Sequence, residues 1–236
     1  MLEIQKICLI TLLTFIFTIS SCTKKPVMNT TQLADTPLTF LALGDSYTIG
    51  ESVSESEKWP VQLSDSLASK GVTIEKTDII ATTGWTTEEL LAGIEEASPD
   101  TTYDLVSLLI GVNNQYRGYD ISTYRFEFEE LLQQAISFAG GDPSKVFVVS
   151  IPNYGVTPFG QTRGEDKIRQ ELLEYDAIAE DIATNYGIPF VNITPISEKA
   201  KTYPALVASD DLHPSGKMYT LWVEEILPIV EEMLKQ

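Results

Sequence analysis

Basic residues, histidine and cysteine are all scarce in this chain. Among 236 residues there are 16 lysines and arginines against 34 acidic residues, one histidine and two cysteines, so the formal net charge is −18. Nucleic-acid binding depends on basic patches, so this balance argues against a nucleic-acid partner. It argues equally against electrostatic adhesion to anionic lipid. With so few imidazoles and thiols, a zinc site would need mainly carboxylates, which is unusual.

Motifs for common cofactors are also missing. The sequence has no Gly-x-x-x-x-Gly-Lys-Ser/Thr phosphate loop and no Gly-x-Gly-x-x-Gly after an apolar run. No stretch has the ligand spacing of an EF-hand calcium loop. We therefore expect neither a cofactor nor a resident metal ion.

An apolar run near the N-terminus points to export. Ile7 to Ile19 is almost unbroken apolar sequence, followed by Ser20, Ser21 and Cys22. This run is too short for a bilayer span, which takes about 20 helical residues, but it has the length of a signal-peptide core. Its ending on Cys22 resembles a bacterial lipoprotein signal, in which that cysteine is acylated. An ordinary cleaved export signal with an incidental cysteine is the alternative.

The lipoprotein interpretation divides the chain into three segments. Residues 1–21 form the signal peptide, 22–36 a polar tether and 37–236 one domain, large enough to bury a single core. Removal of Cys8 with the signal leaves Cys22 as the one cysteine, so no internal disulfide is possible. The resemblance implies an exported protein, anchored by lipid to a membrane of the bacterial cell envelope.

Five short apolar runs alternate with helical patterns after residue 36. Buried strands separated by helices indicate an α/β fold: a three-layer α/β/α sandwich with a five-stranded, mostly parallel sheet. The expected strands are Leu38–Leu43, Val72–Ala81, Leu105–Ile110, Val146–Ile151 and Phe190–Ile193. The expected helices are Trp59–Lys70, Thr86–Ala97, Phe126–Phe138, Asp166–Tyr186 and a last one capped by Ser215 and ending at Met233.

The residues that follow these strands are chemically distinctive. Open parallel sheets bind ligands at the carboxyl ends of their strands. Gly44-Asp45-Ser46 ends the first strand, and His213 lies in the loop after the fifth. A serine becomes a strong nucleophile when a base, usually a histidine oriented by a carboxylate, takes its proton. Because the chain has one histidine, His213 is the only candidate for an imidazole base.

Four sequence elements together resemble the SGNH hydrolases, also called GDSL esterases and lipases. The family has a Gly-Asp-Ser serine, a lone glycine, a Gly-x-Asn element and an Asp-x-x-His pair, and all four occur here in that order between Gly44 and His213. The resemblance implies the flavodoxin-like SGNH hydrolase fold and ester hydrolysis through an acyl-serine. It implies Ser46 as nucleophile, His213 as base and Asp210 as its orienting carboxylate. The oxyanion donors would be the N–H groups of Ser46 and Gly84 and the amide of Asn113.

Simpler interpretations of these residues stay open at this stage. Gly-Asp-Ser can be an ordinary turn, Gly84 a loop glycine and Asn113 a turn residue, as we expect for Asn114. Asp211 competes with Asp210 but is one residue out of register with the Asp-x-x-His motif. Two positions depart from the family pattern, because Tyr47 replaces the leucine of GDSL and Asn114 stands where aspartate is frequent.

The function implied is that of a carboxylic ester hydrolase. Two substrate classes fit, acetyl groups on carbohydrate and acyl esters of lipids such as lysophospholipids. No large apolar insertion or lid is evident, which favours a short acyl group. Acyl transfer to a sugar hydroxyl is one alternative. The other is a catalytically inactive binding lipoprotein, which would not require Ser46, Asp210 and His213 together.

Overall fold

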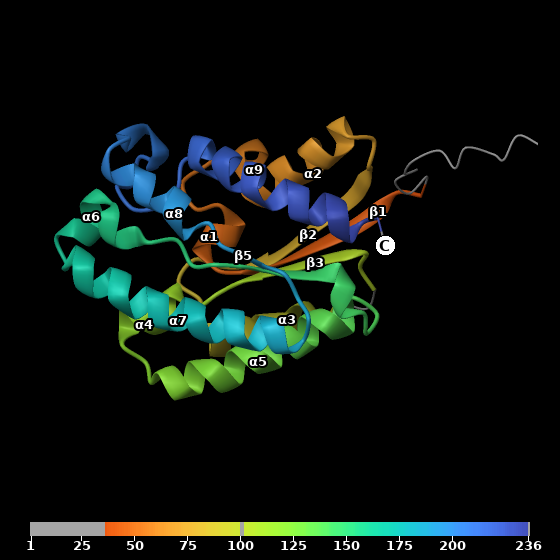
Figure 1. The fold of residues 1–236 in the computed structure, drawn as a ribbon, viewed down its shortest axis with the longest axis horizontal. Helices are drawn as coiled ribbons and strands as arrows, with labels where there is room; N and C mark the ends of the chain where they lie inside the picture. Colours follow the sequence, from red (N-terminus) through yellow and green to blue (C-terminus); the bar gives the residue numbers. More distant parts are fainter. Residues whose placement is uncertain (1–35, 100–101, 236) are drawn as a thin grey trace, which may run out of the picture. The chain divides into compact units, whose positions relative to one another are not determined.

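The computed structural model describes residues 36–99 and 102–235. The predicted signal peptide, Cys22 and all of the tether except its last residue, Thr36, lie outside the described residues. Within the described range, five strands form one sheet in the order β2-β1-β3-β4-β5, with every neighbouring pair parallel (Figure 1). The strands are β1 Leu38–Gly44, β2 Ile74–Ala81, β3 Leu105–Leu109, β4 Val146–Val149 and β5 Phe190–Val191.

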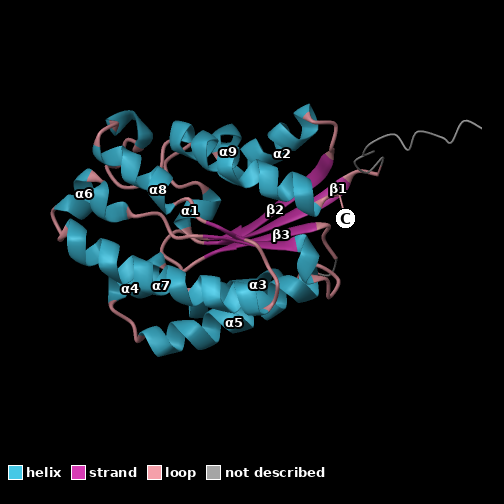
Figure 2. Cartoon of the chain, in the orientation of Figure 1, coloured by secondary structure: helices cyan, strands magenta, loops and turns pink. Residues whose placement is uncertain are grey.

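Helices cover both faces of this sheet, which confirms the predicted three-layer fold. Figure 2 shows α1, α2, α8 and α9 on one face and α3, α4, α5 and α7 on the other. The helices are α1 Ser46–Ile49, α2 Trp59–Ser69, α3 Thr87–Ala97, α4 Val112–Arg117, α5 Ile121–Phe138, α6 Pro158–Gln161, α7 Glu165–Asn185, α8 Thr194–Ser197 and α9 Gly216–Met233. Short 3₁₀ turns occupy Glu55–Glu57, Pro143–Lys145, Tyr154–Val156, Glu198–Lys201 and Pro204–Leu206. None of the described helices is long and apolar enough to cross a membrane.

The central strands are apolar on both faces because both faces are covered. All of β3 and the last five residues of β1 are buried. Large side chains from the sheet and from α2 meet in the core, where the ring centroids of Phe40 and Trp59 lie 6.2 Å apart and those of Phe40 and Phe147 6.3 Å apart. Continuous apolar strands of this kind are typical of parallel sheets.

The strand order places the carboxyl ends of β1 and β3 side by side, at the point where the order of the strands reverses. From β1 the chain passes to β2 on one side, and β3 then pairs with β1 on the other. Ligands of such sheets bind where the strand order reverses in this way. Gly44 pairs with Leu109, so the two strands end level and the residues after them, Ser46 and Asn113, start from neighbouring points.

Most predicted boundaries agree with the structure, and the differences have local causes. The helices predicted at 59–70, 86–97 and 166–186 lie within one residue of α2, α3 and α7 at each end. Helix α5 begins five residues before the predicted Phe126, because the Asp120 carboxylate accepts a 2.8 Å hydrogen bond from the N–H of Ser122 and starts the helix there. Strands β4 and β5 are two residues shorter than predicted, since their ladder ends at the Val149–Val191 pair.

Candidate active site

Ser46 follows directly on a sharp change from strand to helix. Gly44 ends β1 so close to its neighbours that a Cβ there would lie 2.2 Å from Thr48 Oγ1 and 2.5 Å from the Leu109 carbonyl oxygen. Asp45 caps α1 by accepting a 3.0 Å hydrogen bond from the N–H of Tyr47. Ser46 is the first residue of α1, 4% exposed, and lines a cavity. The tight turn therefore brings the hydroxyl of Ser46 to the surface of that cavity.

The carboxyl group of Asp45 is fully buried beneath this turn. Burial raises its pKa to about 7, although backbone hydrogen bonds, chiefly from Tyr47, act in the opposite direction. Its Oδ2 atom has no hydrogen-bond partner among the described residues. Asp45 thus serves as a buried cap of α1, and no hydrogen bond or ion pair joins its carboxylate to His213 in the described chain.

His213 is paired with Asp210. Its Nδ1 lies 2.6 Å from Asp210 Oδ2, while Asp210 Oδ1 accepts 2.9 Å hydrogen bonds from the N–H groups of Leu212 and His213. The side chain of His213 is 10% exposed. Partial burial raises the pKa of Asp210, but the hydrogen bonds from Ser52, His213 and Leu212 outweigh it and hold that pKa well below its usual range. The pair therefore has an ionised carboxylate that fixes the ring orientation.

The competing carboxylate, Asp211, contacts a different part of the structure. Its backbone is left-handed, with φ +64°, and its carbonyl oxygen accepts a 3.0 Å hydrogen bond from the N–H of Phe159. No hydrogen bond joins its carboxylate to His213 in the described chain. The loop itself is held by an antiparallel bridge between Val207 and Pro214 and by a 2.7 Å bond from the Ala208 N–H to the His213 carbonyl oxygen.

Two of the predicted oxyanion donors, Asn113 in α4 and Gly84 in the loop before α3, lie on segments that a hydrogen bond joins. Asn113 Nδ2 donates a 2.9 Å hydrogen bond to the carbonyl oxygen of Trp85, next to Gly84. Gly84 has φ +92° and its carbonyl oxygen accepts a 2.6 Å bond from Arg117 Nη2. One N–H of the Asn113 amide and the N–H groups of Ser46 and Gly84 have no protein partner in the described part of the chain. These three donors are therefore free to bind a ligand oxygen.

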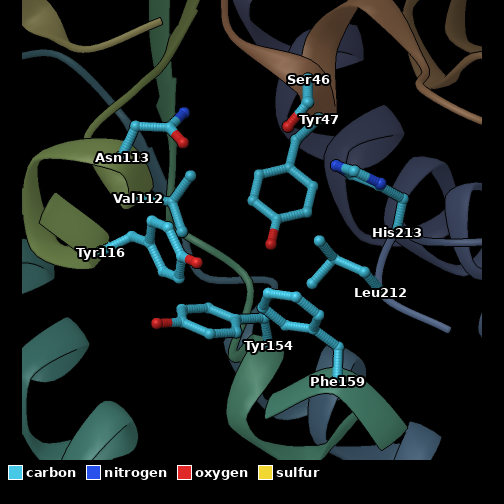
Figure 3. Close-up of a pocket in the computed structure, with 9 residues that line it drawn as sticks. All are labelled: Ser46, Tyr47, Val112, Asn113, Tyr116, Tyr154, Phe159, Leu212 and His213. Atoms are coloured by element: carbon cyan, nitrogen blue, oxygen red, sulfur yellow. The ribbon is translucent and has the colours of Figure 1, made fainter. Parts of the chain in front are cut away.

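One cavity of about 140 Å³ gathers most of the predicted residues. Figure 3 shows Ser46 at one end of it, between Asn113 and His213, with the Tyr47 ring extending into the centre. No hydrogen bond joins Ser46 Oγ to His213 in the described structure, and such bonds often tighten only when substrate is present. Gly84 is not among the lining residues. These are Ser46, Tyr47, Val112, Asn113, Tyr116, Tyr154, Phe159, Leu212 and His213.

Three residues that hold the site in place were not predicted to do so. Asn114 was expected in a turn but is buried in α4, where its side chain bonds the N–H of Thr87 at 3.1 Å and the Thr87 hydroxyl at 2.7 Å, which fixes the start of α3. Arg117 and Ser52 hold Gly84 and Asp210 through contacts distant in sequence, so no local pattern could have revealed them. Among the described residues, no cluster of three or more histidines, cysteines or carboxylates could hold a metal ion.

Sequence comparison identifies the class to which this fold and site belong. Residues 42–221 match the GDSL-like Lipase/Acylhydrolase family. The chain therefore belongs to this family of serine esterases and lipases, the SGNH hydrolases. It is 30% identical over 141 residues to an acetylxylan esterase from Geobacillus stearothermophilus, a match that covers 56% of this chain and only 61% of that relative.

Solved structures share the fold at low sequence identity. A psychrotrophic esterase, EstA from Pseudoalteromonas sp., superposes with a TM-score of 0.61 at 18% identity, over 84% of this chain and all of its own. A variant of Axe2, an acetyl xylan esterase from Geobacillus stearothermophilus, superposes with a TM-score of 0.62 at 20% identity, over 82% of this chain and 94% of its own. Phospholipase A1 from Streptomyces albidoflavus superposes with a TM-score of 0.62 at 16% identity, over 84% of this chain and all of its own. At these identities the likeness establishes the SGNH hydrolase fold.

Proposed function

We propose that this chain hydrolyses carboxylic esters through an acyl-enzyme on Ser46. His213 takes the proton of the serine hydroxyl as Ser46 Oγ bonds to the ester carbonyl carbon, and Asp210 stabilises the charged imidazole. The carbonyl oxygen becomes an oxyanion, held by the N–H groups of Ser46 and Gly84 and by the Asn113 amide. The C–O bond then breaks, and His213 returns its proton to the leaving alcohol. Water, deprotonated by His213, releases the acid and regenerates Ser46.

The observation that carries this proposal is the Asp210–His213 pair beside the cavity that contains Ser46. The 2.6 Å contact between Nδ1 and the carboxylate leaves the other ring nitrogen of His213 available to the serine side of the cavity. Ser46 and His213 line the same cavity, so a bound ester would meet both. An inactive binding protein would not need this combination.

The size of the cavity favours a short acyl group. A site of about 140 Å³ is close to the ~150 Å³ known to hold a benzene-sized ligand, so it takes roughly six non-hydrogen atoms. Acetyl and butyryl groups fit within that limit, whereas a long fatty acyl chain would extend beyond it. Tyr47 and Tyr154 enclose the space with rigid rings.

Acetylated carbohydrate is our first choice of substrate. Tyr116, on the rim of the cavity, is 51% exposed, and such a ring can lie against the apolar face of a sugar. The matched relative is an acetylxylan esterase, which supports the same choice. The test is a series of nitrophenyl esters from acetate to decanoate, with acetate release from acetylated xylan measured in parallel. A maximum at acetate to butyrate is expected, and a maximum at octanoate or longer would favour a lipid ester instead.

We also propose that the enzyme is exported and anchored by lipid at Cys22. Support comes from the apolar run Ile7–Ile19 and its ending on Cys22. Firm anchoring requires more than one acyl chain, because a single myristoyl-sized chain binds only marginally. Metabolic labelling with an alkyne fatty acid in a bacterial host should mark the wild type and not Cys22→Ser, and Cys8→Ser serves as the matched control. An unlabelled wild type would leave the ordinary export signal as the better explanation.

A further inference from the structure

A second cavity, of about 280 Å³, adjoins the catalytic one. Tyr116 and Tyr154 line both cavities. The ring centroids of these two tyrosines lie 6.3 Å apart, and that of Phe159 lies 6.2 Å from Tyr116 and 6.4 Å from Tyr154. The three rings form the side of the catalytic cavity opposite Ser46 in Figure 3. An ester whose acyl group occupies the first cavity can therefore extend its alcohol half across this aromatic layer into the second.

The second cavity is lined mainly by basic residues, in contrast to the negative charge of the chain as a whole. Arg117, Arg163 and Lys167 line it, and Glu171 is the one acidic residue among its described lining residues. The chain carries more than two acidic residues for every basic one, with a net charge of −18. Three cations against one carboxylate in a single cavity are thus a local concentration of positive charge. Its lining residues come from α4 and the glycine after it, the 3₁₀ turn Tyr154–Val156, the segment after α6 and the first two turns of α7.

Arg163 has no acidic partner in the described part of the chain. None of the ion pairs found there involves it. Its guanidinium carbon lies 3.6 Å from the centroid of the Phe159 ring, and Nη1 donates hydrogen bonds to the Phe159 carbonyl oxygen at 3.0 Å and to Thr162 Oγ1 at 3.2 Å. A stacked guanidinium keeps its remaining N–H groups in one plane, which suits two oxygens of a planar or tetrahedral anion.

The other two cations are engaged to different degrees. Lys167 Nζ lies 3.6 Å from Glu171 Oε1, but its side chain is 77% exposed, so this pair contributes little and is easily exchanged. Arg117 is already bonded to the Gly84 carbonyl oxygen and to Glu89. Arg163 and Lys167 are therefore the cations available to a ligand. Glu171 and two acidic residues of the next cavity, Asp120 and Glu174, repel an anion. An anion is therefore confined to the side of the cavity that holds Arg163 and Lys167.

We infer that this cavity is an anion subsite, in which Arg163 and Lys167 bind a carboxylate or phosphate group on the alcohol half of the ester substrate. The inference rests on the proposed function, because it assigns the alcohol half of the same substrate. A chain of strongly negative charge repels anionic substrates at long range. The subsite provides local attraction that only an ester with a correctly spaced anionic group can use.

The experiment compares matched acetate esters. 4-Acetoxybenzoate and 4-acetoxyphenyl phosphate are each compared with the neutral 4-acetoxybenzamide, and 3-(4-acetoxyphenyl)propanoate with its amide extends the reach by two carbons. We expect kcat/KM of the wild-type enzyme to be about two- to fivefold higher for an anionic ester than for its neutral partner, the effect of one solvent-exposed ion pair. The carboxylate and phosphate arms show which anion is preferred, and added salt should reduce the preference.

The variant Arg163→Gln/Lys167→Gln should lower the anionic-to-neutral ratio of kcat/KM to about one or below. Lys70→Gln/Lys235→Gln removes the same charge outside both cavities and should keep the wild-type ratio. Turnover of the neutral ester without preference for any anion would overturn the subsite and leave the proposed function standing, as would an equal loss in the control. Failure to hydrolyse neutral and anionic esters alike would overturn the proposed function and the subsite with it.

Discussion

Ser52 Oγ donates a 2.6 Å hydrogen bond to Asp210 Oδ2, the same carboxylate oxygen that lies 2.6 Å from His213 Nδ1. Ser52 follows α1 and has a left-handed backbone, with φ +65°. Its hydroxyl contributes to the low pKa of Asp210, together with the bonds from His213 and the backbone. Ser52 is therefore a positioning residue that holds the carboxylate oxygen facing the imidazole.

Ser52→Gly should lower kcat by roughly fivefold, the effect of losing about 1 kcal/mol of hydrogen bonding. Glycine accepts a φ of +65° without strain, so this variant removes the hydroxyl and preserves the turn. Ser98→Gly is the matched control, because Ser98 also has a positive φ but lies at the end of α3, outside the site. Equal kcat values for Ser52→Gly and wild type would show that the hydroxyl has no part in positioning Asp210.

Asp210→Asn and Asp211→Asn should separate the two neighbouring carboxylates. Loss of the orienting carboxylate in a serine–histidine–aspartate triad costs about 10⁴-fold in kcat, and we expect a loss of roughly 10³–10⁴-fold for Asp210→Asn. Asp211→Asn should change kcat by less than about twofold, since asparagine tolerates its left-handed backbone. Steady-state kinetics on 4-nitrophenyl acetate measure both. The reverse order of effects would move the orienting role to Asp211.

Tyr47→Leu should shift the acyl-length preference toward longer esters. The Tyr47 ring is 3% exposed, lies 5.8 Å from the His213 ring and extends into the catalytic cavity. Its removal enlarges the acyl site, and each methylene that becomes buried should raise kcat/KM relative to acetate by roughly fourfold, or about 0.8 kcal/mol. The exposed Tyr203 lies outside the cavity, so Tyr203→Leu is the control. An unchanged profile would mean that Tyr47 does not limit the acyl group.

Asp176→Asn should flatten the dependence of stability on pH. Burial raises the pKa of Asp176 to about 7, although hydrogen bonds from the Ile151 N–H and the Thr194 hydroxyl act in the opposite direction. Between about pH 4, where the unfolded side chain titrates, and about pH 7, the unfolded state releases a proton that the folded state keeps. The free energy of unfolding of the wild type therefore falls as the pH rises through this window.

Urea unfolding at pH 5 and pH 8 measures this effect. Asparagine can accept the Ile151 N–H bond and donate toward Thr194, so the variant should lose less stability than the wild type between the two values. The pKa of Asp45 is also raised to about 7, and this residue is unchanged in the variant. Part of the dependence of stability on pH therefore remains. The low pKa of Asp210 acts with the opposite sign, but only near and below the unfolded value of about 4. An equal change in the free energy of unfolding between pH 5 and pH 8 in the two proteins would show that Asp176 is ionised in the folded state at pH 5.

The strands and long helices were predictable because each has enough residues to show a pattern. The run Leu105–Ile110 is apolar at every position except Ser107, which in a parallel sheet means coverage on both faces. The short helices α4, α6 and α8 have four to six residues each, too few to show a helical period. The contacts that hold these helices in place, such as that of Asn114 in α4 with Thr87 at the start of α3, join residues distant in sequence and are not revealed by it.

The residues of the site were predictable by motif, whereas their supports were not. Ser46, Asn113 and His213 follow strands of one parallel sheet, so their convergence on a single cavity follows from topology. Ser52 and Arg117 act on Asp210 and Gly84 from positions 158 and 33 residues away. The basic cavity depends on Arg163 and Lys167, which the sequence shows only as two cations among many acids.

Labelling with a fluorophosphonate tests the central claim most directly. Such a probe phosphonylates a serine that a neighbouring base has activated, and tryptic mass spectrometry locates the adduct. We predict one adduct per molecule, on Ser46, complete loss of adduct and turnover in Ser46→Ala, and undiminished labelling in the nearby control Ser54→Ala. An adduct on another serine, or full ester hydrolysis by the folded Ser46→Ala variant, would contradict the assignment of Ser46 as the nucleophile.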